Sequence, residues 1–249
     1  MLVQRIALCI LLLGLAPSGH AITAEELAAK NTEAKGGSAA LGAVQSVRRS
    51  GQVSLNAGQF VLAVTETRQR PDSIRQEASV QGLTQIESYD GKEGWRIDPF
   101  GGRKDPERVP ADDLKGLIED ADIGGPLASY KDHGSTLEYL GTEDVDGTAA
   151  HKLKVTQKNG DLQYVYLDPD YFLEIRIESQ RSVRGVKRTY VTDLGEYAKV
   201  DGLFWPMAVS YGRKGDRDPA KTRYDKVEVN VPIEPGYFSF PAAAGPAKN

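Results

Sequence analysis

Residue patterns that would activate a nucleophile are sparse in this sequence. His133 lies two residues before Ser135 in the segment HGS, and a nucleophilic serine needs a nearby base. Two neighbours in one loop do not make a triad, which is defined by the geometry of three groups. The G-x-S-x-G turn of the common serine hydrolases does not occur in the sequence. The sequence therefore predicts no catalytic residues and a protein that is not an enzyme.

Metal and phosphate chemistry also lack their usual patterns. Of the three histidines, His20 lies in the N-terminal segment and the other two, His133 and His151, are far apart; no H-E-x-x-H motif occurs. The acidic segment TEDVDG (142–147) lacks the full calcium-loop pattern and is better explained as a hairpin turn. The acidic pair 112–113 suits the first turn of a helix, and the glycines of FGG (100–102) do not precede a helix in a βαβ unit. The sequence therefore predicts no metal site and no cofactor.

The N-terminal residues have the layout of a secretory signal peptide. Arg5 precedes the apolar run 6–15, and small residues end the segment at Ala21, where cleavage is expected. The run is too short to span a bilayer, although an uncleaved anchor helix is the alternative. Cys9 lies inside the run, so it is not placed as an acylation site, and the mature chain has no cysteine. These features predict export to the periplasm.

Net charge and charge patterning argue against nucleic acid as a partner. The whole chain has 31 basic and 35 acidic residues, for a formal charge of −4. Removal of residues 1–21 takes away one arginine and no acid, so the mature chain carries 30 basic and 35 acidic residues. A mildly acidic chain without a basic block is not typical of a nucleic-acid-binding protein.

The remaining sequence changes from helical to strand periodicity. Thr23 and Glu26 form a capping-box pattern at the start of a helix that ends near Gly36. A second helix is expected at 110–120, with a further short helix after Pro126. Most other segments alternate apolar and polar residues between small turn clusters, as in an antiparallel meander. Asn159-Gly160 suits the tight turn of a hairpin.

Runs of strands with separate helices predict an α+β fold with a large antiparallel sheet. We expect about ten strands, and a twisted sheet of that size tends to curl. A curled sheet would form a half-barrel whose concave face is covered by the helices at 23–36 and 110–120. The expected organisation is a signal peptide at 1–21, a single domain at 22–241 and a disordered tail at 242–249.

Several segments together resemble a known family. They are AKNTEAKGG before VQSVRRSGQV, then YDGKEGWRIDP, TEDVDGTAAHKLKV, YLDPDYFLEIRIES and VDGLFWPMAVS. This set is similar to the LolA-like periplasmic proteins, often called outer-membrane lipoprotein-sorting proteins, and it covers nearly all of the mature chain. The resemblance implies a half-barrel closed by helices around an apolar cavity for acyl chains. The present chain is longer than the archetypal carriers, and none of their functional residues can be matched in it.

A carrier of acyl chains needs an extensive apolar wall. Sheltering a sixteen-carbon chain from water is worth on the order of 12 kcal/mol, at about 0.8 kcal/mol per methylene. Strands can supply this wall when their apolar alternates point inward. We expect the wall to centre on Trp95, Ile97, Phe60, Leu62, Tyr164, Ile175 and Phe204, and the full lipid-binding set adds Val53, Leu55, Tyr166, Leu173, Trp205 and Met207. Pro206 suits a strand end or an edge, which would place Phe204 and Trp205 near a cavity mouth. For any one of these residues the simpler alternative is ordinary core packing against a helix, or a local aromatic plug at 204–206.

The sequence-based hypothesis is a carrier that moves a lipid or an acylated lipoprotein across the periplasm, toward the outer membrane. It predicts lipid or lipoprotein as cargo and a membrane-bound donor and acceptor. Three alternatives remain: a periplasmic sensor of lipid or misfolded protein, an esterase acting on a bound lipid, and a solid β domain with a scaffold role. A cavity inside the half-barrel would separate the carrier, the sensor and the esterase from the solid β domain.

Overall fold

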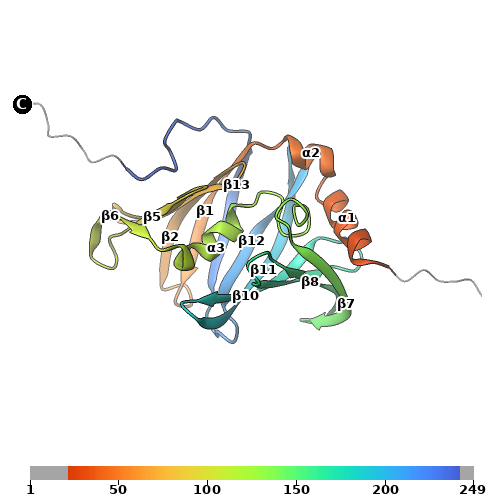
Figure 1. Cartoon of the computed structure of the whole chain (residues 1–249). Helices are drawn as coiled ribbons and strands as arrows, with labels where there is room; N and C mark the ends of the chain where they lie inside the picture. Colours follow the sequence, from red (N-terminus) through yellow and green to blue (C-terminus); the bar gives the residue numbers. More distant parts are fainter. Residues whose placement is uncertain (1–21, 242–249) are drawn as a thin grey trace, which may run out of the picture.

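The computed structural model describes residues 22–241; the expected signal peptide and the expected disordered tail lie outside the described residues. The chain forms one antiparallel sheet of thirteen strands, in the order β6-β5-β4-β3-β2-β1-β13-β12-β11-β10-β9-β8-β7 (Figure 1). This order consists of two meanders, one from β1 to β6 and one from β7 to β13. They join side by side where β1 pairs with β13. The sheet is curved and does not close.

The first meander contains β1 (Ser46–Leu55), β2 (Phe60–Gln69), β3 (Ser73–Val80), β4 (Leu83–Asp90), β5 (Gly94–Asp98) and β6 (Arg103–Val109). The second contains β7 (Thr136–Val145), β8 (Thr148–Thr156), β9 (Leu162–Leu167), β10 (Glu174–Val183), β11 (Val186–Val200), β12 (Leu203–Arg213) and β13 (Ala220–Val229). The helices are α1 (Ala24–Ala34), α2 (Ser38–Ala43) and α3 (Ala111–Ala121). The expected large antiparallel sheet is confirmed, although the fold is mostly β and the label α+β fits it loosely.

The expected number of strands was too low. A strand at 103–109 is missing from the prediction because RKDPERV is charged, lacks apolar alternation and contains Pro106. This segment is β6, the last strand at one edge of the sheet, where proline and charged side chains are tolerated. The further short helix expected after Pro126 is also wrong, because residues 126–134 form turns. The hairpin turn expected at 146–147 is confirmed, with Asp146 and Gly147 both at positive φ. A hairpin also forms around Asn159-Gly160, but β8 and β9 are joined by residues 157–161 rather than by the expected tight turn.

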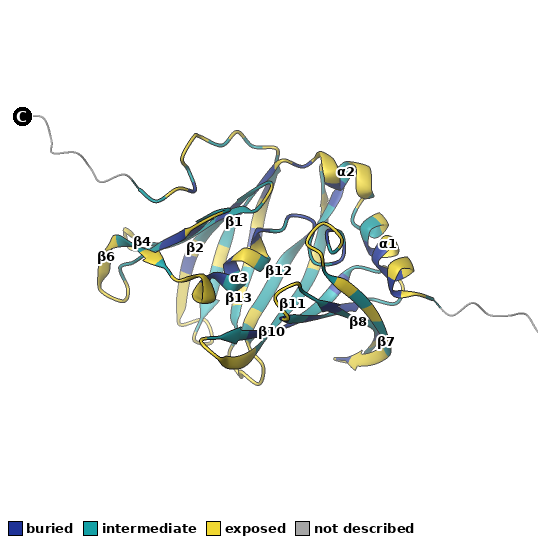
Figure 2. Ribbon diagram, in the orientation of Figure 1, coloured by how far each residue is buried: buried dark blue, intermediate teal, exposed yellow. Residues whose placement is uncertain are grey.

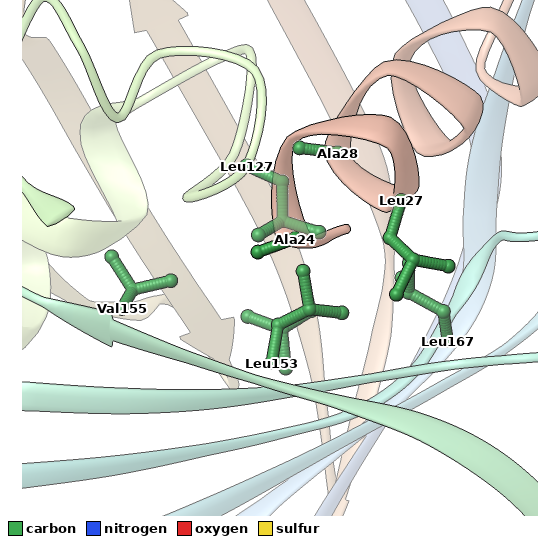
Figure 3. Packing of buried hydrophobic residues seen from close by; sticks show 8 residues of the cluster. Ala24, Leu27, Ala28, Leu127, Leu153, Val155 and Leu167 are labelled. Atoms are coloured by element: carbon green, nitrogen blue, oxygen red, sulfur yellow. The ribbon is translucent and has the colours of Figure 1, made fainter. Parts of the chain in front are cut away.

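The N-terminal helix is built as its sequence predicts. The Thr23 hydroxyl accepts a hydrogen bond from the Glu26 amide, and the Glu26 carboxylate accepts one from the Thr23 amide, which completes the capping box. The apolar side of α1 packs on β8 and β9, where Leu27 meets Leu153 and Leu167 (Figure 3). All three leucines are fully buried, so this cluster holds α1 over one end of the concave face.

Helix α3 covers the other end of the concave face, on β3 to β5. Its residues Leu114 and Leu117 form a cluster with Ile74, while Tyr89 packs beside them. Gly94 makes this approach possible, since a Cβ atom there would lie 2.6 Å from the Leu114 side chain. The helices expected to cover the sheet therefore do so. Figure 2 shows buried residues on the sides of α1 and α3 that meet the sheet, whereas the hairpin tips are exposed.

The segment after β13 packs on the convex face of the sheet. The Phe238 carbonyl accepts hydrogen bonds from the Trp95 indole at 2.8 Å and from the Ser88 hydroxyl at 2.9 Å. The Tyr237 carbonyl accepts one from Arg75 at 3.0 Å. Three side chains of β3 to β5 therefore fix this segment to the outside of the half-barrel.

Candidate functional site

A cavity of about 820 Å³ lies on the concave face of the sheet. This volume falls within the range of roughly 300–1,000 Å³ that is usual for small-molecule sites. The lining combines residues of α3 with residues of the central strands of both meanders. The cavity therefore occupies the space that α1 and α3 leave between them.

Strand register decides which residues face this cavity. Directly opposed residues of antiparallel strands share one face, and the pairs Val53–Leu62 and Arg49–Glu66 lie on the concave one. Gly51 lies between Arg49 and Val53, at an irregularity in the pairing of β1 with β13. A Cβ atom there would lie 2.0 Å from the Arg223 carbonyl oxygen, so the two strands can approach this closely only at glycine.

Aliphatic side chains line two sides of the cavity. One side comes from β1 to β3 together with α3, and the other comes from β10 to β12. The residues are Val53, Val64, Ala78, Leu114, Leu117, Ile177, Val183, Leu194 and Val209. These sides offer the kind of surface that a hydrocarbon chain requires.

Between the aliphatic sides lies a buried charged group, which we call the central ion cluster: Arg49, Glu66 and Arg68. The Glu66 carboxylate lies 2.7 Å from Arg49 Nη2 and 2.7 Å from Arg68 Nε. Burial opposes ionisation of Glu66, but the two guanidinium groups outweigh it and lower its pKa to about 2. The guanidinium of Arg49 also lies 4.1 Å from the Tyr224 ring, and burial raises the pKa of that phenol to about 12.

Helix α3 adds further charge opposite the sheet. Glu119 lies 3.2 Å from Arg181 of β10, and burial raises the pKa of this carboxyl despite the nearby arginine. Neighbouring atoms remove part of the hydration of the Asp120 carboxylate and raise its pKa, although the residue is not buried from solvent. Asp120 keeps an exposed surface while it lines the cavity, and its carboxylate makes no hydrogen bond or ion pair with the residues that the structure describes. The cavity therefore has a polar centre between apolar sides.

The structure places the expected wall residues in several different environments. Val53, Phe204 and Trp205 line the cavity. Leu62 is buried on the same face as Val53. The next pair on that face, Leu55 with Phe60, lies at the hairpin end, where Phe60 is 57% exposed. Met207 packs against the cluster around Trp205, and Leu173 immediately precedes β10.

Trp95, Ile97 and the two tyrosines of β9 lie away from the cavity. On β5 it is Arg96 that lines the cavity, so its neighbours Trp95 and Ile97 face the convex side. On β9 Gln163 lines the cavity, which directs Tyr164 and Tyr166 to the opposite face. The wall position expected for these four residues is thus corrected, because a strand places alternate residues on opposite faces.

Two further residues differ from the expectation. Ile175 packs with Tyr164 and Tyr166 rather than with the cavity lining. Pro206 lies within β12 rather than at its end, and it lines the cavity. The pairing of β12 with β13 covers only Ala208 to Tyr211 in the described chain, so the absent amide hydrogen of Pro206 interrupts no bond to β13.

The charged residues of the cavity were not predicted from the sequence. They could have been found from the same alternation of residues that was used to predict the apolar wall. Val47, Arg49 and Val53 share one face of β1, while Leu62, Val64, Glu66 and Arg68 share one face of β2. A charged residue in phase with buried aliphatic residues on two paired strands indicates an interior ion pair.

In the part of the chain that the structure describes, no group of three or more histidine, cysteine or acidic residues could hold a metal ion. Among the same residues, no helix is long and apolar enough to cross a membrane.

Comparison with known proteins rests on structure. No protein-family model matches the sequence, and no curated protein matches it. Three solved structures superpose with a TM-score of 0.58 each. The first is described as an outer membrane lipoprotein-sorting protein domain from Vibrio parahaemolyticus, with 12% identity over 87% of this chain and 96% of that one. The second is a LolA superfamily protein from Nitrosomonas europaea, with 13% identity over 88% of this chain and 98% of that one.

The fold is LolA-like. The third structure, a DUF1329 family protein from Desulfovibrio piger, agrees, with 13% identity over 86% of this chain and 95% of that one. Coverage is nearly complete on both sides, so the likeness includes both meanders and the helices that cover them. The LolA-like fold predicted from the sequence is confirmed, and at this level of identity the comparison concerns the fold alone.

Proposed function

We propose that this protein is a periplasmic carrier that holds a lipid, or the acyl chains of a lipoprotein, in the concave cavity. The observation that carries the proposal is the cavity itself, because a half-barrel with a scaffold role would be filled by its own side chains. The outer-membrane lipoprotein-sorting description of one structural neighbour supports the same function.

The lining favours an amphiphile over a plain hydrocarbon. Acyl chains would lie along the aliphatic sides formed by residues such as Val64 and Ile177. A polar group of the same molecule would lie near the central ion cluster, since an apolar ligand there would leave charges covered and unsolvated. The paired charges of this cluster offer both donors and acceptors to such a group.

Transfer by this carrier involves no chemical reaction. A membrane-bound donor would load the cavity and a membrane-bound acceptor would empty it, with the direction set by differences in affinity. Transport toward the outer membrane and an N-terminal signal peptide are part of this proposal.

Mass spectrometry of organic extracts from gently purified protein tests the proposal directly. We expect a stoichiometric lipid or acylated species. An empty protein that also fails to retain added fatty acid or phospholipid would contradict it, and release of lipid fragments would favour the esterase alternative.

A bulky substitution on the cavity wall makes the test local. Ala78 of β3 lines the cavity, whereas Ala63 of the paired strand β2 is exposed on the convex face. Ala78→Trp should fill part of the cavity and reduce lipid retention at least tenfold, and Ala63→Trp should leave retention unchanged. Equal retention by both folded variants would place the bound lipid outside this cavity.

A further inference from the structure

The two ends of the sheet carry opposite charge. Connections between strands alternate between the ends, and each is counted here with two strand residues on either side. The basic end comprises the connections 56–59, 81–82, 99–102, 157–161, 184–185 and 214–219. The acidic end comprises 70–72, 91–93, 146–147, 168–173 and 201–202. The basic end has nine basic and four acidic residues, and the acidic end has four basic and nine acidic residues, for formal charges of +5 and −5.

Most cations of the basic end are free to meet a partner. Three of the nine are engaged in ion pairs: Arg103 with Glu107, Arg184 with Asp113, and Lys214 with Glu178. The other six are exposed and form no ion pair with any residue that the structure describes: Lys104, Lys158, Lys187, Arg213, Arg217 and Lys221. Two of the four acids are engaged in local contacts: Asp161 pairs with Lys115, and Asp98 accepts a hydrogen bond from the Gly101 amide in the same turn.

The basic end also carries large apolar side chains that are open to solvent. Five such residues are between 42% and 57% exposed: Phe60, Val61, Leu83, Phe100 and Val186. They occupy the tips of four different hairpins. Phe60, Leu83 and Val186 are the first residues of β2, β4 and β11. Among the described residues, the acidic end has a single large apolar side chain of this kind, Tyr171. Exposed apolar groups gathered at one end of a molecule mark an interaction site.

We propose that the basic end docks on the surface of an anionic lipid bilayer. Apolar tips surrounded by unpaired lysine and arginine match a surface that is negative outside and apolar beneath its headgroups. The acidic end would be repelled by the same surface, so the charge separation orients the molecule as well as attracting it. In Figure 1 the hairpins β1–β2, β10–β11 and β12–β13 end at the lower side. The first turn of α3 reaches the β10–β11 hairpin, where Asp112 and Asp113 contact Arg184.

Docking in this orientation would bring the cavity to the membrane. The lining extends to Val183 and Arg184 at the β10–β11 hairpin and to Ala220 at the start of β13. A lipid could then pass between bilayer and cavity over a short distance. The docking itself holds whether or not the cavity carries lipid, because none of the apolar tips lines the cavity.

Vesicle co-sedimentation tests this docking. The protein should bind vesicles that contain phosphatidylglycerol and should bind phosphatidylcholine vesicles much more weakly, with affinity falling as salt rises. Each cation near an anionic surface contributes about fivefold in affinity, which is ~1 kcal/mol. Lys187→Ala should therefore weaken binding about fivefold, and the triple change at Lys104, Lys187 and Arg217 to alanine should weaken it on the order of 100-fold.

Matched changes at the acidic end provide the control. Lys92→Ala removes an exposed lysine at the other end and should not weaken binding. Phe60→Ser should weaken binding roughly tenfold, whereas Tyr171→Ser should have no effect. All six positions changed singly or together are exposed, and circular dichroism is used to check that each variant is folded. Absence of vesicle binding, equal binding to both kinds of vesicle, or equal losses from changes at the two ends would overturn the proposal.

Lipid extraction separates this result from the proposed carrier function. A protein that docks on anionic vesicles but yields no lipid would retain the docking surface and lose the carrier role. A lipid-loaded protein that does not bind vesicles and binds only a membrane protein would be consistent with the carrier role and would refute the docking.

Discussion

Glu66→Gln is a direct test of the central ion cluster. Glu66 is 6% exposed and contacts both Arg49 and Arg68 at 2.7 Å. Its pKa falls from 4.5 to about 2, and this difference corresponds to on the order of 3 kcal/mol of stability at neutral pH. Removal of one partner from a buried ion pair typically costs about 3–5 kcal/mol, which agrees. We expect the glutamine variant to lose about 3 kcal/mol of unfolding free energy at pH 7.

The pH dependence gives this prediction its sharpest form. A carboxyl whose pKa is lowered in the folded state stabilises the protein fully above its ordinary value of 4.5. That contribution is lost as pH falls from about 4.5 toward 2, because the folded state must then take up the proton. The difference between wild type and variant should therefore be constant from pH 7 to about 5 and should close at lower pH. Urea unfolding at a series of pH values measures it.

Glu77→Gln is the matched control for this experiment. Glu77 lies on the next strand and pairs with Arg75 at 2.7 Å, but its carboxylate is on the convex side and about a quarter exposed. Ion pairs with this access to water contribute less than about 1 kcal/mol. A Glu66→Gln cost as small as that of Glu77→Gln, or a Glu66→Gln cost that stays constant down to pH 3, would refute the assignment of a buried, strongly coupled cluster.

Three further predictions concern other parts of the fold. Trp95→Phe removes the donor to the Phe238 carbonyl, so limited proteolysis should cut the C-terminal segment faster while lipid retention stays unchanged; a loss of retention would instead favour a role for Trp95 in the wall. Leu153→Ala should cost about 2–5 kcal/mol in urea unfolding, because the side chain is fully buried beneath α1, and a smaller loss would indicate loose packing there. Asp120→Asn should stabilise the protein in urea unfolding; the gain should be absent below the ordinary value of 3.8, should grow as pH rises from 3.8 to the raised pKa of this carboxyl and should stay constant above it, and an effect of opposite sign would show that Asp120 has a cationic partner.

Sequence patterns were sufficient for most of the helices and strands, and the family resemblance was sufficient for the fold. The capping box at Thr23, the turn at Asp146-Gly147 and the alternation of β1 and β2 follow from local chemistry, which the structure reproduces. The LolA-like resemblance then supplied the curvature of the sheet, which local patterns do not encode. The edge strand β6 was not predicted, because an edge strand needs no alternation of apolar and polar residues.

Sequence patterns did not show which side of each strand faces the concave side of the sheet. Alternation in GWRID shows that Trp95 and Arg96 point in opposite directions, but it does not show which direction is concave. The assumption that aromatic residues face the cavity failed at β5 because the segment around Phe238 covers the convex side and buries Trp95 there. That contact joins residues 143 positions apart, so no local signal announces it.

The central ion cluster explains why the half-barrel stays hollow. Helix α3 packs with Leu114 and Leu117 on Ile74, near the end of β3, and this contact is apolar on both sides. Over the centre of the sheet the facing residues are Arg49 and Glu66, and an apolar helix surface placed there would cover charges without replacing their remaining contacts with water. The helix instead turns Asp120 toward the centre, where its own charge also resists dehydration. Collapse of the cavity is therefore unfavourable for the same reason that an amphiphile with a polar group suits it better than a hydrocarbon.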